Sequence, residues 1–152
     1  AAIERHTAFA EDPVQLRGGW AMDVDELYDM AGLGPNDLDV VMTYDDYPVI
    51  SLMQFEDLGF CAKGEGAAFV RSHDLTIEGD FPHNTSGGQL SAGQAGPAGG
   101  FLGMTEALRQ VLGRAGPTQV ANASRALVSG FGMINYDRGL ASGAAILAGG
   151  AA

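Results

Sequence analysis

A glycine-rich stretch, residues 84–96, is the feature of this sequence that most constrains the fold. It reads NTSGGQLSAGQAG and carries small residues where a core segment would carry bulky ones. Glycine permits positive φ angles and a close approach of backbone N–H groups to a ligand. An apolar run with helical spacing follows from Pro97, which predicts a helix whose N-terminus faces this loop. Glycines that only let two elements pack closely would give the same composition, so that alternative stays open.

Composition and charge exclude several classes of function. The stretch lacks the Lys-Ser ending of a nucleotide P-loop and the spacing of a dinucleotide fingerprint. A net charge of −11, with only eight Lys and Arg residues, argues against nucleic acid as a partner. A single cysteine rules out an intrachain disulfide and a cysteine-based zinc cluster, and we predict no metal site. No apolar run is long enough to cross a bilayer and no signal peptide is recognisable, which predicts no membrane association and a cytoplasmic location.

The order of residues in the loop resembles a known motif. From Asn84 the sequence reads Asn-x-x-Gly-Gly-x-x-x-x-Gly-Gln, which resembles the thiolase-superfamily motif that ends in Gly-His. Upstream, AGLGPNDLDV (residues 31–40) is similar to the family's segment that leads into a central strand. YDDY (residues 44–47) and EDLGFCAKGEG (residues 56–66) then resemble its lipid-transfer-protein-type branch. Downstream, EALRQ (residues 106–110) and ALVSG (residues 126–130) continue in the family's order. The resemblance implies an α/β fold, a thiolase-like C-terminal half with a mixed sheet and alternating helices.

The resemblance also bears on domains and partners. At 152 residues the chain is predicted to be a single thiolase-like C-terminal domain, residues 1–152. The family's full subunit consists of two similar halves, and this chain resembles only the second. We therefore expect the N-terminal thiolase half as a partner, either as a separate chain or as a missing segment. Members of this branch also work with a small zinc-ribbon/OB-fold accessory protein, so a hetero-oligomer is expected.

Hydrophobic periodicity and breaker residues place the expected elements. Asp23 is predicted to cap a helix that runs to Ala31, with Leu27 and Met30 on its buried side. A strand is expected over residues 38–43 and a helix from Pro48. Shorter strands are expected over residues 67–70, 125–129 and 144–147, the last two joined by a connection that is too rich in glycine and polar residues to be merely a hairpin turn. In the helix after Pro97, the residues at helical spacing are predicted to face the core: Phe101, Met104, Leu108 and Val111.

The resemblance implies carbon-carbon bond formation or cleavage next to the carbonyl of a coenzyme A thioester, with no cofactor bound by this chain. Such chemistry needs a proton donor or acceptor and hydrogen-bond donors for an enolate-like oxygen. Gln94 stands where thiolases have a histidine, and it can donate a hydrogen bond but cannot shuttle a proton. No cysteine occurs near residues 129–132, where thiolases keep a second catalytic cysteine. Tyr136 lies in the corresponding loop, which is similar to the steroid side-chain aldolase branch; a packing tyrosine is the alternative.

Other residues complete the candidate site. His83 could orient the substrate or act as a base, or could be a loop histidine bonded to backbone. The predicted catalytic residues are Tyr136, Asn84, Gln94 and His83. The predicted substrate-binding residues are Ser86, Gly87, Gly88, Tyr44 and Asp45, of which the last two follow a strand at the sheet edge where ligands bind in α/β folds. The neighbouring carboxylates Asp45 and Asp46 are interpreted as a capping pair at the strand end, with an acid-base dyad as the alternative, and Cys61 is interpreted as a buried structural thiol.

Three functions follow from these observations. The chain is the C-terminal half of an atypical thiolase or aldolase that acts on acyl-CoA, with Asn84, Gln94 and Tyr136 near the reacting carbon. Alternatively, it is a non-catalytic thiolase-like scaffold that completes or stabilises an active partner. A lipid or acyl-carrier binding module is the third possibility.

Overall fold

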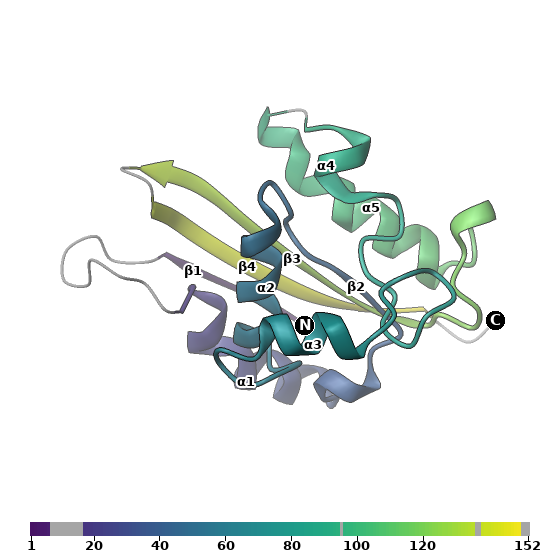
Figure 1. Cartoon of the computed structure of the whole chain (residues 1–152), viewed down its shortest axis with the longest axis horizontal. Coiled ribbons are helices and arrows are strands. Elements are labelled where there is room, and N and C mark those ends of the chain that lie inside the picture. The colour runs from purple at the N-terminus through teal and green to yellow at the C-terminus, as the bar shows by residue number, and fades with distance from the viewer. Residues whose placement is uncertain (7–16, 95, 136–137, 150–152) are drawn as a thin grey trace.

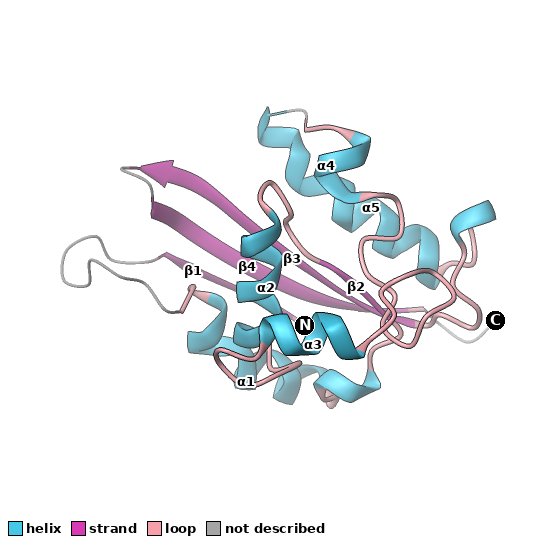
Figure 2. Ribbon diagram, in the orientation of Figure 1, coloured by secondary structure: helices cyan, strands magenta, loops and turns pink. Residues whose placement is uncertain are grey.

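The computed structural model describes residues 1–6, 17–94, 96–135 and 138–149 (Figures 1 and 2). The strands in this part of the chain are β1 (Ala2–His6), β2 (Val40–Met42), β3 (Arg125–Asn135) and β4 (Arg138–Ala148). The α-helices are α1 (Trp20–Ala31), α2 (Pro48–Asp57), α3 (Gly66–Ser72), α4 (Gly88–Ala92) and α5 (Gly100–Val111). Short 3-10 helices are η1 (Pro35–Asp37), η2 (Gly96–Gly99) and η3 (Gly116–Thr118).

The strands form one mixed sheet in the order β1-β4-β3-β2. Strands β1 and β3 pair antiparallel with β4, whereas β2 pairs parallel with β3. The α/β fold with a mixed sheet is therefore confirmed. Because β2 and β3 run in the same direction, their carboxyl ends meet at one edge of the sheet, where side chains from different elements can converge.

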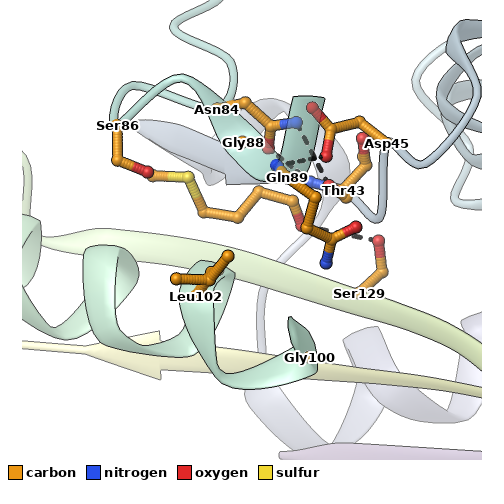
Figure 3. A pocket seen from close by; sticks show the side chains of 11 residues that line it. Thr43, Asp45, Asn84, Ser86, Gly88, Gln89, Gly100, Leu102 and Ser129 are labelled. Atoms are coloured by element: carbon orange, nitrogen blue, oxygen red, sulfur yellow. Dashed lines mark hydrogen bonds between the residues drawn. The ribbon is translucent and has the colours of Figure 1, made fainter. Parts of the chain in front are cut away.

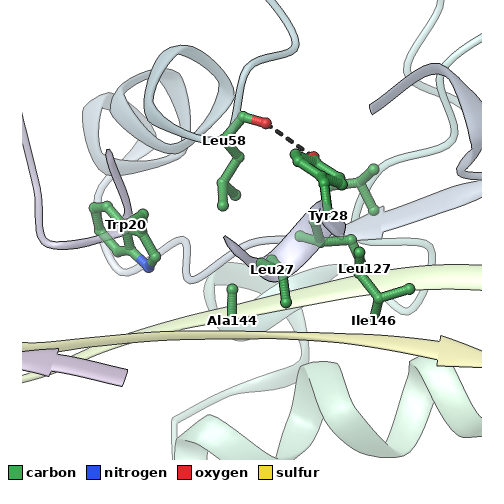
Figure 4. Packing of buried hydrophobic residues seen from close by; sticks show 8 residues of the cluster. Trp20, Leu27, Tyr28, Leu58, Leu127, Ala144 and Ile146 are labelled. Atoms are coloured by element: carbon green, nitrogen blue, oxygen red, sulfur yellow. Dashed lines mark hydrogen bonds between the residues drawn. The ribbon is translucent and has the colours of Figure 1, made fainter. Parts of the chain in front are cut away.

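Helices cover both faces of this sheet (Figure 1). Helix α1 and the end of α2 enclose a core on one face, where Trp20, Leu27 and Leu58 are fully buried (Figure 4). On the other face α5 packs against β2 and β3, and Ala107 is buried there with Val40. Helix α3 packs against α2, where the ring of Phe69 contacts that of Phe55.

The beginning of α1 differs from the prediction. The helix begins at Trp20 with Gly19 as its N-cap, so Asp23 lies within the first turn and does not cap it. The Trp20 side chain is fully buried and its indole Nε1 donates to the carbonyl oxygens of Gly130 (3.1 Å) and Gly143 (3.2 Å). This tertiary contact extends the helix towards the sheet by one turn. Met30, expected to be buried, is 53% exposed.

Residues 67–70 form part of helix α3 and not a strand, so that prediction was wrong. The run is short and apolar, and such a run fits either element by periodicity alone. The Glu56 carboxylate accepts a hydrogen bond from the backbone N–H of Gly66 (2.9 Å) and so fixes the start of the helix. Phe69 then packs on Phe55 with ring centroids 5.5 Å apart.

The connection expected between the last two strands is mostly strand. Strands β3 and β4 are each 11 residues long and pair through positions such as Gly130 with Gly143 and Gly132 with Ala141. Glycine lowers the strand propensity of this segment, and its continuous cross-strand pairing outweighs that preference. Two further predicted breakpoints hold, since α2 begins at Pro48 and α1 ends at Gly32 with φ +63°. The helix expected from Pro97 begins at Gly100, directly after the 3-10 helix η2.

Helix α5 presents a different face to the core than periodicity indicated. Met104 and Val111 pack against the buried cluster as predicted. Phe101 and Leu108 are 69% and 43% exposed, so their assignment to the core was wrong. The buried face instead carries polar residues, including Glu106. Its carboxylate accepts hydrogen bonds from Thr85 (2.8 Å) and Gln110 (2.9 Å), and pairs with Arg109 (2.7 Å), which allows a charged side chain to be buried.

Candidate active site

The candidate site lies at the carboxyl end of β2. The segment before the glycine-rich loop runs parallel to β2, where Val41 N–H donates to Pro82 and Asn84 N–H donates to the Val41 carbonyl, both at 3.0 Å. Thr85 anchors the loop to α5 through Glu106. The loop is therefore held on both sides, against the sheet and against a helix.

Asn84 locks this loop to the strand end. Its backbone has a positive φ of +45°, a conformation that asparagine tolerates better than most residues. Its Oδ1 accepts from the N–H of Thr43 (2.9 Å) and its Nδ2 donates to the Thr43 carbonyl (3.1 Å). The amide thus makes the two backbone hydrogen bonds of Thr43 that a neighbouring strand would otherwise make. One amide hydrogen remains for another acceptor.

Asp45 and the paired glycines form the next part of the site. The Asp45 carboxylate is buried and accepts a hydrogen bond from the backbone N–H of Gln89 (2.7 Å) at the beginning of α4. Gly88 has φ +61°, and a Cβ there would overlap that carboxylate. Gly87 also has positive φ (+96°). The Gly-Gly pair is therefore needed for both its backbone conformation and the close approach of Asp45.

A small cavity of about 10 Å³ lies between this loop and α5 (Figure 3). It is enclosed by the polar side chains of Asn84, Ser86 and Gln89 on one side and by Leu102 of α5 on the other. A space of this size holds roughly one water molecule. The structure thus brings four of the predicted site residues to one cavity: Asp45, Asn84, Ser86 and Gly88.

Tyr44 and Gln94 form a pair beside this cavity. Gln94 Nε2 donates to the Tyr44 hydroxyl oxygen (2.9 Å), which leaves the phenolic hydrogen to donate elsewhere. Tyr44 is 8% exposed and its ring lies 6.0 Å from that of Phe131. Burial, the negative charge of Asp46 and a hydrogen bond with the Asp46 side chain raise the pKa of Tyr44, although the hydrogen bond from Gln94 opposes them. At neutral pH the site therefore offers a protonated phenol.

His83 lies behind the site and does not line the cavity. Its Nε2 is 2.8 Å from Thr43 Oγ1, which itself donates to Ser51 Oγ (2.9 Å). The imidazole packs edge-on against Phe55 at 4.9 Å, and burial lowers the pKa of His83 to about 4. His83 is therefore neutral at pH 7 and holds Thr43 in place.

The pKa of His83 predicts a loss of stability in mild acid. The folded state binds the proton with a pKa of about 4, below the ordinary value of 6.5. The stabilisation is therefore complete above pH 6.5 and is lost as the pH falls towards 4. Allowing for the partial exposure of the ring, we expect a loss of about 2 kcal/mol between pH 7 and 4.5. Urea unfolding of the wild type and of His83→Gln measures it, since the variant should lack this component.

A matched control for that experiment is His73→Gln, which replaces a histidine paired with Asp80 near the surface (2.8 Å). This variant should keep the acid-dependent loss. Equal pH dependence in the wild type and His83→Gln would contradict the assignment.

Other predicted residues fall in different places. Tyr136 lies outside the described residues. Cys61 is half-buried, and burial raises the pKa of its thiol, which fits the interpretation as a structural residue.

Gln89 and Ser129 line the cavity but were not predicted, although Gln89 stands inside the motif. Gln54 was also missed: it is fully buried on α2 and bonds both the N–H (3.1 Å) and the carbonyl (2.7 Å) of Tyr44.

In the described parts of the chain, no group of three or more His, Cys, Asp or Glu side chains could hold a metal ion. No helix within those same residues has the length and apolar character needed to span a bilayer.

Comparison with known proteins identifies the family to which this fold belongs. Residues 1–142 match the family described as thiolase C-terminal domain-like. The chain belongs to this family. It is 35% identical to the sterol carrier protein 2 of Rattus norvegicus over 130 residues, which cover 84% of this chain and 24% of that protein.

Two further relatives are aldolases. The steroid side-chain-cleaving aldolase of Thermomonospora curvata is 41% identical over 88 residues, 58% of this chain and 22% of the aldolase. The solved structure titled Ltp2-ChsH2(DUF35) aldolase has a TM-score of 0.78 and 27% identity, over 97% of this chain and 38% of that one. The chain spans about a quarter of the length of the curated relatives it matches. It is thus a thiolase-like domain that corresponds to part of those proteins.

Proposed function

We propose that this chain supplies the C-terminal side of an active site that cleaves or forms a carbon-carbon bond in a coenzyme A thioester. The observation that carries the proposal is the Tyr44–Gln94 pair, a protonated phenol oriented by an amide at the sheet edge. An enolate forms when the bond between Cα and Cβ of a β-hydroxyacyl thioester breaks. A hydrogen-bond donor stabilises the enolate oxygen, and a proton must reach Cα. Tyr44 can serve either need.

The residues present favour an aldolase-like reaction over thiolysis. In the retro-aldol direction the β-hydroxyl gives up its proton, the Cα–Cβ bond breaks with its electron pair going to Cα, and Cα takes up a proton. A carbonyl compound and a shorter thioester result, with no net gain or loss of protons. No thiol nucleophile is required for this step. Gln94 replaces the histidine of thiolases and cannot act as a base. The aldolases among the relatives agree with this choice.

Changing Gln94 tests the pair directly. Gln94→Ala removes the hydrogen bond that lowers the pKa of Tyr44, so that pKa should rise. We expect turnover of a β-hydroxyacyl-CoA to fall about 10-fold, and activity to persist to higher pH because the phenol deprotonates later. The measurement is the pH profile of kcat/KM for the protein in its native assembly. Ser91→Ala, at an exposed position three residues away, is the control, and an unchanged profile in Gln94→Ala would count against the role of the pair.

The partner that we propose for this chain is an N-terminal thiolase-like half. Helices α4 and α5 and the residue that caps α5 expose apolar side chains: Leu90 is 59%, Phe101 69% and Leu112 56% exposed. Beside α5 lies a groove of about 230 Å³ lined by small and apolar residues, including Met104 and Ala145. An exposed apolar surface of this kind is typical of an interface. The greater length of the relatives supports a second half as its occupant.

Phe101→Asp tests this interface. Since the side chain is exposed, folding of the chain should be unaffected, while association with the N-terminal half should weaken at least 10-fold. Native mass measurement of the mixed components reads this out. Met22→Asp is the matched control, because Met22 is 65% exposed on α1, over the opposite face of the sheet. Equal weakening by the two changes would contradict the assignment.

A non-catalytic scaffold is the alternative, favoured by one observation. Both ends of the Asn84 amide are bonded within the chain, which suits a purely structural loop. Turnover that survives simultaneous change of Tyr44 and Gln94 would support this role. We also propose that the assembly includes a small zinc-ribbon/OB-fold accessory protein and that it is cytoplasmic.

A further inference from the structure

Gln89 has an unusual environment for a buried amide. It is 9% exposed in the short helix α4, and its backbone N–H donates to Asp45. Its side-chain Nε2 donates to the carbonyl of Gly99 (3.1 Å). Its Oε1 is buried and finds no hydrogen-bond donor among the described residues. A buried acceptor without a donor is destabilising, so such atoms in native proteins are normally bonded to protein or ordered water.

The space next to this amide fits one water. Gln89 lines the cavity of about 10 Å³, which is too small for any larger ligand and about sufficient for a single water molecule (Figure 3). A buried water requires two to four polar partners. Gln89 offers the acceptor, Asn84 a remaining amide hydrogen, and Ser86 a hydroxyl at the same cavity.

The same amide is also connected to Gln94 through Gly99. Gly99, whose carbonyl Gln89 holds, packs so closely under Gln94 that a Cβ on Gly99 would be 2.9 Å from Gln94 Cγ. Gln94 in turn donates to Tyr44. A chain of contacts therefore runs from the cavity to the phenol.

From these contacts we propose that Gln89 is a positioning residue that links one bound water to the Tyr44–Gln94 pair. Its amide oxygen accepts a hydrogen bond from the water in the cavity, and its amide nitrogen fixes Gly99 and thereby Gln94. The importance of this link for turnover rests on the proposed function. The water site and the placement of Gln94 do not, and both can be measured without an activity assay.

The first test is a high-resolution crystal structure of the protein in its native assembly. We expect one water within hydrogen-bond distance of Gln89 Oε1. Gln89→Met, similar in length but without the amide, should lose the water and release Gly99. Gln89→Glu keeps an acceptor but not the donor, so it should retain the water while Gly99 moves. An empty cavity in the wild type, or a side chain bonded to Oε1 in place of water, would overturn the water site.

The second test follows the titration of Tyr44 by NMR with tyrosine labelled at the ring carbon that bears the hydroxyl, assigned with Tyr44→Phe. Loss of the hydrogen bond from Gln94 should move this titration to higher pH in Gln94→Ala and also in Gln89→Glu and Gln89→Met. In a Gln94→Ala background, changing Gln89 should cause no further shift. A Gln89 effect that persists in that background, or none in the wild-type background, would refute the positioning role. Neither test measures turnover, so a failed aldolase assay would contradict the proposed function without deciding this inference.

Discussion

Tyr44→Phe is expected to lower kcat/KM for a β-hydroxyacyl-CoA by about 10²–10³-fold. The change removes the hydroxyl that Gln94 orients and leaves the ring in place against Phe131. Proton donation by a positioned side chain typically contributes about 10²–10⁴-fold to a rate. Because the lost interaction is made with the developing enolate, the decrease should fall on kcat more than on KM.

The control for Tyr44→Phe is Tyr47→Phe, which removes a hydroxyl three residues away from a side chain that is 60% exposed. This variant should keep full turnover. The measurement is kcat and KM of both variants in the native assembly, with circular dichroism to confirm folding. A Tyr44→Phe enzyme within twofold of the wild type would show that the phenol takes no part in the reaction.

Gly88→Ala is expected to destabilise the protein by about 3–5 kcal/mol. Two effects add: the residue has φ +61°, which costs an alanine about 1–2 kcal/mol, and the new Cβ would overlap the Asp45 carboxylate. Moving Asp45 breaks its hydrogen bond to Gln89 and leaves a buried carboxylate without that donor.

Gly32→Ala is the matched control for the Gly88 change, since Gly32 has nearly the same φ (+63°) and nothing within 4 Å of the added Cβ. It should cost only about 1–2 kcal/mol. Urea unfolding at pH 7 measures both variants. Equal destabilisation would mean that the contact with Asp45 has no energetic consequence and that the glycine is required for its backbone conformation alone.

The prediction from sequence was most accurate at positions where the backbone preference of a single residue determines the local structure. Pro48 and Gly32 mark helix ends because proline and glycine have strong backbone preferences. Trp20 began α1 earlier than expected because its indole bonds to strands more than 100 positions away. No local pattern contains that information.

Within the site, the motif predicted the position of the loop better than the roles of its side chains. Asn84 does lie at the strand end, but most of its amide is used to hold Thr43. His83 was considered as a base, whereas its aromatic surroundings keep it neutral. Gln89 also bonds to Asp45 and Gln54 to Ser129, 44 and 75 positions away, so local spacing alone could not reveal these two residues.

The most direct test of the proposed function is a product assay on the intact assembly that contains this chain. The assembly is incubated with a β-hydroxyacyl-CoA, and the carbonyl compound and the shortened acyl-CoA are quantified by mass spectrometry. We predict equal amounts of the two products, with formation dependent on Tyr44. Binding of the thioester with no cleavage in either direction, in an assembly shown to contain both thiolase-like halves, would contradict a catalytic role and leave the scaffold as the better account.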